Sequence, residues 1–172
     1  MTFANKLGSN YSEIRASARY KTITVQANDA IFDLKVRIPV KREMDALAST
    51  ITDPEQAKID AIYEMLGAPL RKTLEDAEEG FIDALNKDGD KIRITDNDVI
   101  VDGTSVRQVA KMTAIWQTQV EKYFSLLQSA TGEPITESYD EIAEEFSESV
   151  IREIVSKIDE AIKPNYKESK KN

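Results

Sequence analysis

Two short acidic stretches, Asp88-Gly89-Asp90 and Asp96-Asn97-Asp98, are the first candidates for chemistry, because Ca²⁺ prefers carboxylate and amide oxygens as ligands. An EF-hand loop needs such ligands at its first, third and fifth positions, Gly at the sixth and Glu at the twelfth. Placing Gly89 at the sixth position puts Ala84 at the first, and no other register satisfies the pattern. Asp, Asn and Gly also form tight turns, so both stretches are interpreted as turns and no metal site is expected.

Paired carboxylates are the second candidate, because two acidic groups can share general acid–base work. Glu75 with Glu79 and Glu141 with Glu145 are four residues apart and share a helix face. Such pairs are common on solvated helix faces. The chain has no His and no Cys, which removes the usual proton carrier near neutral pH and any thiol nucleophile. It also has no Gly-rich phosphate loop. We therefore expect neither an enzyme nor a bound cofactor.

Binding of another protein is the third candidate, and it rests on two apolar stripes at helical spacing, within residues 109–127 and 150–162. Aromatic side chains dominate binding hot spots, but apolar stripes on helices also fill protein cores. Which stripe is core and which meets a partner stays open on the sequence alone. The candidate partner-binding residues are Trp116, Tyr123, Phe124, Ile151, Ile154, Val155 and Ile158.

The elements that carry these residues follow from local periodicity. Residues 1–10 are expected to form a loose leader and residues 11–18 a short helix. Alternation of apolar and polar side chains then predicts a β-hairpin around Ala27-Asn28-Asp29-Ala30. Pro39 is expected to end the second strand. The apolar side chains assigned to that strand are Ile31, Leu34, Val36 and Ile38.

The middle of the chain is predicted to be helical. Residues 41–49 form the first helix. Asp53-Pro54-Glu55-Gln56 is typical of a helix start, with Asp53 as the cap and Pro54 at the first helical position. Gly67 is placed to end that helix, and a further helix is expected from Leu70 to about Leu85.

A small second hairpin is predicted near residues 91–101, around the Asp96-Asn97-Asp98 turn. Ser105 is a suitable N-cap for the longest helix, which is expected to run from Val106 to about Ala130. Two final helices are expected over residues 138–146 and 148–162. The predicted fold class is therefore α+β, mainly helical, with an N-terminal hairpin, a second small hairpin and long C-terminal helices.

Charge and composition suggest how the chain is divided. We expect an α+β domain over residues 1–132, an acidic helical part over residues 133–162 and a disordered Lys-rich tail over residues 163–172. The acidic part holds ten acidic and two basic residues, and the net charge of the chain is −8. This charge disfavours nucleic acid as a partner, although a dense carboxylate surface keeps DNA mimicry as a weaker alternative. We see no signal peptide and no long apolar run, so we expect a cytoplasmic protein that is not bound to a membrane.

Three stretches resemble the tail assembly chaperones of long-tailed bacteriophages. Leu34-Lys35-Val36-Arg37-Ile38-Pro39-Val40, followed by Arg42-Glu43-Met44, is similar to the strand-then-helix opening of that family. Val99-Ile100-Val101-Asp102-Gly103-Thr104-Ser105, followed by residues 110–116, resembles the entry to its central helix. The third stretch is the acidic C-terminal part that ends in Lys170-Lys171-Asn172. The family brings no catalytic motif, so it implies no catalytic residues.

The resemblance implies a protein that coats the tape measure protein, keeps it soluble and helps to recruit tail tube subunits. Such a chaperone acts in the host cytoplasm and is absent from the finished particle. Family members often accompany a longer product made by a ribosomal frameshift, and the Lys170-Lys171 pair is compatible with an A-rich slippery run. A structural tail or connector subunit is the alternative, and self-association into a homo-oligomer stays open.

Overall fold

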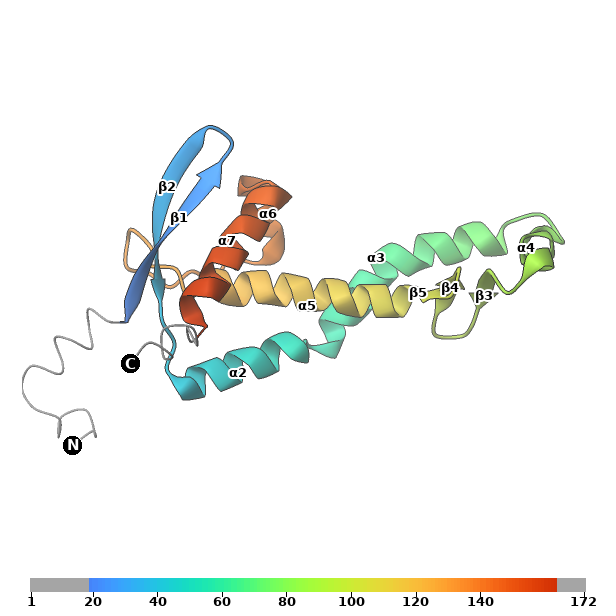
Figure 1. The fold of residues 1–172 in the computed structure, drawn as a ribbon. Helices are drawn as coiled ribbons and strands as arrows, with labels where there is room; N and C mark the ends of the chain where they lie inside the picture. The colour runs from blue at the N-terminus through green and yellow to red at the C-terminus, as the bar shows by residue number, and fades with distance from the viewer. Residues whose placement is uncertain (1–18, 164–172) are drawn as a thin grey trace, which may run out of the picture. The chain divides into compact units, whose positions relative to one another are not determined.

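The computed structural model describes residues 19–163, and the fold is α+β, as predicted (Figure 1). The predicted leader, the predicted helix over residues 11–18 and nearly all of the predicted Lys-rich tail lie outside the described residues. The elements are β1 (Tyr20–Ala27), β2 (Ala30–Arg37), α2 (Lys41–Thr52), α3 (Gln56–Glu75), α4 (Phe81–Leu85), the 3₁₀ helix η2 (Asn86–Asp88), β3 (Ile92–Ile94), β4 (Val99–Val101), β5 (Thr104–Ser105), α5 (Val106–Phe124), α6 (Tyr139–Glu145) and α7 (Glu148–Ile162).

The chain forms two compact units, and the division falls within α2 and within α5. Among the described residues, unit 1 holds residues 19–48 and 119–163, and unit 2 holds residues 49–118. The predicted domain boundary after residue 132 does not coincide with this division. The reason is that the acidic C-terminal part packs with the N-terminal hairpin: α7 contacts β1, and the Lys21 ammonium donates to the Ala161 carbonyl over 3.0 Å.

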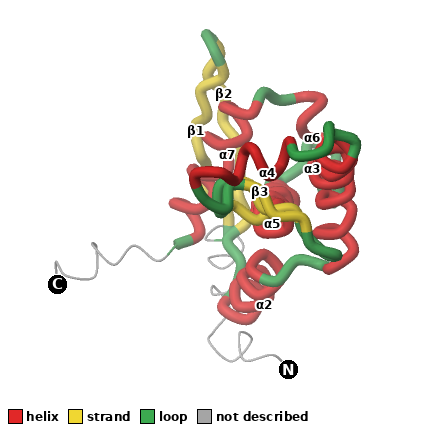
Figure 2. The backbone as a smooth tube through the Cα atoms, turned by 90° about the vertical axis from the view of Figure 1, so that its right-hand side faces the viewer, coloured by secondary structure: helices red, strands yellow, loops and turns green. Residues whose placement is uncertain are grey.

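The predicted N-terminal hairpin is present, with β1 and β2 paired antiparallel and closed by a turn at Asn28, whose φ is 53°. Ile23, Val25 and Val36 are buried on the hairpin face toward α7. Figures 1 and 2 show this hairpin beside α7. Ile31, Leu34 and Val36 lie in β2 as predicted, whereas Ile38 lies one residue beyond its end. Side chains alternate along a strand, so Phe32 and Leu34 share the face of Val36 and Ile31 is 71% exposed.

The core of unit 1 is built on α7, whose apolar stripe is buried along its whole length. Val25 and Val36 of the hairpin, and Val120 of α5, are fully buried there as well. The Tyr123 hydroxyl donates to the Asp159 carboxylate over 2.7 Å and ties α5 to α7. The buried residues of α7 are Val150, Ile151, Ile154, Val155, Ile158 and Ile162.

The long helix ends earlier than predicted, at Phe124 instead of Ala130. Beyond it the chain pairs with the free edge of β2. The Arg37 amide donates to the Leu126 carbonyl over 2.8 Å, and the Gln128 amide donates to the Lys35 carbonyl over 2.9 Å. These bonds form an antiparallel bridge between Val36 and Leu127. A long-range pairing partner therefore overrides the helical periodicity of this segment.

Unit 2 has a small core in which α3 packs against the first part of α5. The cluster consists of Ile59, Ile62, Tyr63, Ala110 and Ala114, with Val106 packed against it. Ala110 and Ala114 lie one helical turn apart on α5, and both are 0% exposed. The core of this unit therefore depends on small residues as well as large ones.

Three predictions about α3 were wrong. The helix begins at Gln56 with Glu55 as its N-cap, and no side chain caps it, so Asp53 does not play that role. Pro54 precedes the N-cap and is therefore not the first helical residue. It then continues through Gly67 and Pro69 to Glu75. Gly67 is buried against the Tyr63 ring, and a proline inside a helix is tolerated when tertiary packing outweighs its local cost.

The predicted helix from Leu70 to about Leu85 is instead divided by a break before α4. Gly80 has a φ of 84° in this break, a left-handed conformation that favours glycine. The second hairpin is present as β3 and β4, and β5 adds a third strand that was not predicted. Ser105 caps α5 as expected, because its hydroxyl accepts from the Gln108 amide over 3.0 Å.

Candidate functional site: an apolar groove in unit 1

The groove arises because α7 covers only part of the inner hairpin face. In the antiparallel register, Ile23 lies opposite Leu34 and Val25 lies opposite Phe32. The β1 member of each pair is buried, since α7 contacts β1. Phe32 and Leu34 on β2 stay half-buried. Two large apolar side chains therefore face a hollow instead of a helix.

This hollow, called the apolar groove below, has a volume of about 320 Å³. Phe124 and Phe146 meet edge to face on one side, with ring centroids 6.2 Å apart and an interplanar angle of 61°. Phe146 is 36% exposed, so part of its ring is open to a ligand. The lining residues are Phe32, Leu34, Phe124, Leu127, Gln128, Ile135, Glu137, Glu141, Ile142, Glu145, Phe146 and Ile154.

Three carboxylates, Glu137, Glu141 and Glu145, form an acidic rim around this apolar lining. Glu141 belongs to the capping box at the start of α6, where the Ser138 amide and hydroxyl both donate to its carboxylate. The Ser138 amide, followed by the hydroxyl, holds the pKa of Glu141 below its usual range. Glu141 therefore carries a negative charge at neutral pH beside an apolar surface.

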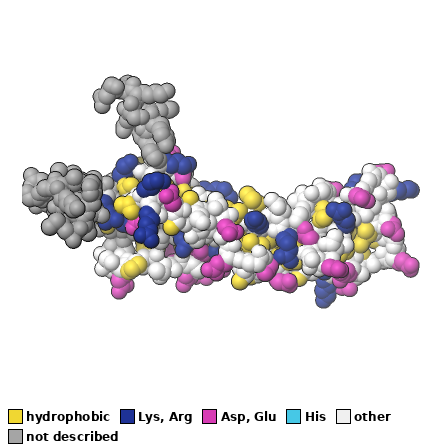
Figure 3. Space-filling view, turned by 90° about the horizontal axis from the view of Figure 1, so that it is seen from below, with side chains coloured by type: hydrophobic (Ala, Val, Ile, Leu, Met, Phe, Trp, Pro, Cys, Tyr) yellow, Lys and Arg dark blue, Asp and Glu magenta, His cyan; other side chains and the backbone are white. Residues whose placement is uncertain are grey.

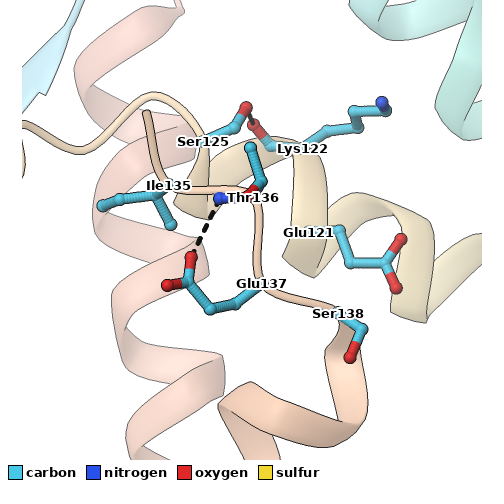
Figure 4. A pocket seen from close by; sticks show the side chains of 7 residues that line it. All are labelled: Glu121, Lys122, Ser125, Ile135, Thr136, Glu137 and Ser138. Carbon is cyan, nitrogen blue, oxygen red and sulfur yellow. Dashed lines mark hydrogen bonds between the residues drawn. The ribbon is translucent and has the colours of Figure 1, made fainter. Parts of the chain in front are cut away.

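A more polar pocket of about 350 Å³ adjoins the groove and shares Ile135 and Glu137 with it (Figure 4). The Glu137 carboxylate accepts from the Thr136 amide over 2.8 Å, as the dashed line in Figure 4 shows. On the other wall, the Glu121 carboxylate accepts from the Tyr139 amide over 3.0 Å. These hydrogen bonds hold the segment before α6 in place, and this segment lines both hollows.

The candidate partner-binding residues named from the sequence are placed mainly in the core. Trp116 is half-buried in unit 2, and the other six are buried in unit 1. The stripe over residues 150–162 is therefore core and is not an exposed binding face. Phe124 and Ile154 nevertheless line the apolar groove.

Four apolar groove residues were not among the candidate partner-binding residues: Phe32, Leu34, Ile135 and Phe146. A signal exists for the first two, because Phe32, Leu34 and Val36 alternate as one strand face. Ile135 is a single apolar residue in a polar loop, and nothing local distinguishes it. Its role depends on residues far away in the chain.

Unit 2 holds a polar network in which Asp98 is the central acceptor. Its carboxylate accepts from the Val99 amide, the Arg107 amide and the Ser105 hydroxyl. Burial opposes ionisation of Asp98 and is the largest single influence, but these hydrogen bonds together lower its pKa. The turn interpretation of Asp96-Asn97-Asp98 therefore agrees with the structure.

Two arginines complete the network of unit 2. Arg107 lies over the Tyr63 ring, 4.2 Å from its centroid, and pairs with Asp60 over 2.9 Å. Arg71 donates to the Thr95 carbonyl over 2.6 Å and to the Asp98 carbonyl over 3.2 Å. Both arginines border a polar hollow of about 380 Å³, but their guanidinium groups are engaged by the protein itself. This hollow is therefore a weaker candidate for ligand binding.

Within residues 19–163, no cluster of three acidic side chains is placed to hold a metal ion. In the same range, no helix combines the length and apolar character needed to cross a bilayer. The face drawn in Figure 3 intersperses basic and acidic side chains with exposed hydrophobic ones. The groove is therefore the strongest candidate site among the described residues.

Comparison of the chain with protein-family models, curated proteins and solved structures gives no match.

Proposed function

We propose that this protein acts by binding another protein, with an apolar segment of that partner held in the apolar groove of unit 1. The observation that carries the proposal is the groove itself: aromatic and aliphatic side chains, partly open, within an acidic rim. Clustered aromatic side chains in a concave surface are typical of binding hot spots. The acidic rim favours a segment with basic residues beside its apolar ones.

In the more specific form of this proposal, the protein is a phage tail assembly chaperone. Its partner is the tape measure protein, and it helps to recruit tail tube subunits. It acts without catalysis in the host cytoplasm and leaves before the particle is complete. A modest groove supports such a role, because weak contacts repeated along a long partner allow both solubilisation and release.

The test is Phe146→Glu, which places a charge at the mouth of the groove. The tape measure protein is co-expressed with the wild-type chain or with this variant, and the soluble complex is recovered by pull-down. We expect the variant to bind about thirtyfold more weakly, the loss typical of a single hot-spot side chain. Phe81→Glu is the matched control, because Phe81 is 47% exposed and lies in unit 2. Equal binding by both variants would refute the groove as the binding site.

Two alternatives predict other results. A structural tail or connector subunit would be present in many copies in purified particles, which mass spectrometry detects. An acidic DNA mimic would bind a basic nucleic-acid-binding protein with affinity that falls steeply as salt rises. Binding in an apolar groove is expected to survive added salt, because burial of apolar surface supplies most of its free energy.

A further inference from the structure

The outer edge of β2 is only half covered. The Lys35 carbonyl and the Arg37 amide are bonded to residues 126–128, so they point away from β1. The backbone amide and carbonyl groups of successive strand residues point to opposite edges. Those of Ile31 and Asp33 therefore point away from β1, like those of Lys35 and Arg37. The Gln26 amide, opposite Ile31, confirms this phase, because it leaves the hairpin to donate to Glu153 over 3.0 Å.

Among residues 19–163, no backbone partner is found for the amide and carbonyl groups of Ile31 and Asp33. Both residues are exposed, and Ile31 is 71% exposed. An unpaired strand edge is a template for another extended chain. The inner face of this same stretch carries Phe32 and Leu34, which line the apolar groove.

The chain itself already adds an extended segment to this edge, at Lys35 and Arg37. The segment 126–128 pairs antiparallel with β2, and Leu127, opposite Val36, lines the groove. A strand that continued along the edge would place side chains opposite Leu34 and Phe32 in the same way, since residues that face each other across a ladder share a side of the sheet. The side chain between them would lie opposite Asp33 on the outer face.

We infer that the groove accepts its partner as an extended strand added to the Ile31–Asp33 edge of β2, and that this strand carries an apolar–basic–apolar sequence. This inference rests on the proposed function. The two apolar residues enter the groove beside Phe32 and Leu34. The basic residue lies opposite the Asp33 carboxylate, and further basic residues face Glu137, Glu141 and Glu145.

The test uses the full-length chain and a fluorescent seven-residue peptide, Ser-Lys-Val-Lys-Leu-Lys-Ser, in which the central Lys lies opposite Asp33. The Ser and Lys before Val leave the ladder, because Gln128 already pairs with Lys35. In the inferred complex the amide of the central Lys points to β2, whereas the Leu amide points away. N-methylation of the central Lys is expected to weaken binding at least about fivefold, the size of one net hydrogen bond. N-methylation of Leu is the matched control and should change affinity little.

Ile31→Pro tests a second bond of the same ladder from the protein side, in which the Ile31 amide donates to the carbonyl of the Lys that follows Leu. It removes an outward amide that does not pair with β1, and proline is tolerated where a strand amide faces outward. Ile31→Thr keeps the amide and is the control. We expect about fivefold weaker peptide binding by Ile31→Pro alone. Hydrogen exchange should also show that the Ile31 and Asp33 amides become protected when peptide binds wild-type protein.

The outcomes separate the two proposals. A peptide of the same composition with Val and Leu four residues apart should bind weakly; equal binding would overturn strand addition. Equal effects of the two N-methyl groups, or no peptide binding at all, would also overturn it. If peptide binding survives N-methylation of the central Lys but is lost in Phe146→Glu, the groove stands and only the extended mode fails. If Phe146→Glu leaves tape measure binding unchanged, the proposed function fails as well.

Discussion

The Asp98 carboxylate accepts three hydrogen bonds and links β4, β5 and the start of α5. Ser105 donates to one oxygen, and the amides of Val99 and Arg107 donate to the other. We expect Asp98→Ala to lower the free energy of unfolding of unit 2 by about 2 kcal/mol, measured by urea denaturation at pH 7, because buried donors lose their acceptor. Asp96→Ala, in the same turn, should change it by less than about 0.5 kcal/mol.

We also expect the contribution of the Asp98 carboxylate to stability to depend on pH. The pKa of Asp98 is lower in the folded chain than its ordinary value of 3.8. Its contribution is therefore fully present above that value and is lost as the pH falls through the folded pKa. The stability difference between wild type and Asp98→Ala should shrink when urea denaturation is repeated below pH 3.8. A difference that is constant across this range would contradict the assigned hydrogen bonds.

For Tyr123 we expect the opposite pH dependence, a loss of stability at high pH. Burial first, and the hydrogen bond to Asp159 second, raise its pKa from 10.0 to about 12. Its contribution to stability is therefore complete below pH 10.0 and is lost as the pH rises through about 12. Titration of tyrosine absorbance should show that Tyr123→Phe removes the component with a pKa of about 12. If Tyr123→Phe instead removes a component that titrates near the ordinary value of 10.0, the buried contact between Tyr123 and Asp159 is refuted.

At the scale of elements, α3 contains one close approach between Gly67 and the Tyr63 ring one helical turn before it. A Cβ added at Gly67 would lie 2.9 Å from Cε2 of Tyr63. That ring is confined by Arg107 above it and by Arg71, which donates to its hydroxyl over 3.4 Å. Overpacking costs about 1–3 kcal/mol, and alanine in a helix regains about 1 kcal/mol over glycine.

We therefore expect Gly67→Ala to lower the stability of unit 2 by about 1 kcal/mol, measured by urea denaturation. In a Tyr63→Leu background, where the ring is absent, the same substitution should be neutral or stabilising. This double-mutant cycle isolates the contact between Gly67 and Tyr63. A stabilising effect of Gly67→Ala in the wild-type chain would mean that the ring moves aside at little cost.

At the scale of the whole molecule, the two units have cores of different quality. Unit 1 buries the long aliphatic stripe of α7, in which Ile151 and Ile158 are 0% exposed. The core cluster of unit 2 is smaller and includes Ala110 and Ala114. Local opening free energies follow buried apolar contacts, so amides of α7 should exchange more slowly than those of α3. Native-state hydrogen exchange read by mass spectrometry tests this order, and faster exchange in α7 would contradict it.

The sequence by itself determined the features that depend on neighbours along the chain. Alternation and the Asn28 turn predicted the first hairpin, Ser105 predicted the start of α5, and the apolar period predicted α6 and α7. The α+β class followed from these elements. Local patterns are reliable here because turn chemistry, caps and periodic burial act over a few residues.

The tertiary structure decided what depends on distant residues. Helical periodicity alone would have carried α5 to Ala130, but residues 126–128 gain backbone partners on β2 and leave the helix. Gly67 reads locally as a helix end, yet α3 continues through it, and the buried face of α3 packs with Ala110 and Ala114 of α5. The apolar stripe of α7 is buried because α7 packs against β1. Phe32 and Leu34 on β2 lie beside the groove, because α7 does not cover the whole hairpin face. Long-range hydrogen bonds and apolar burial outweigh local preference wherever the two compete, and the candidate site was formed by that competition.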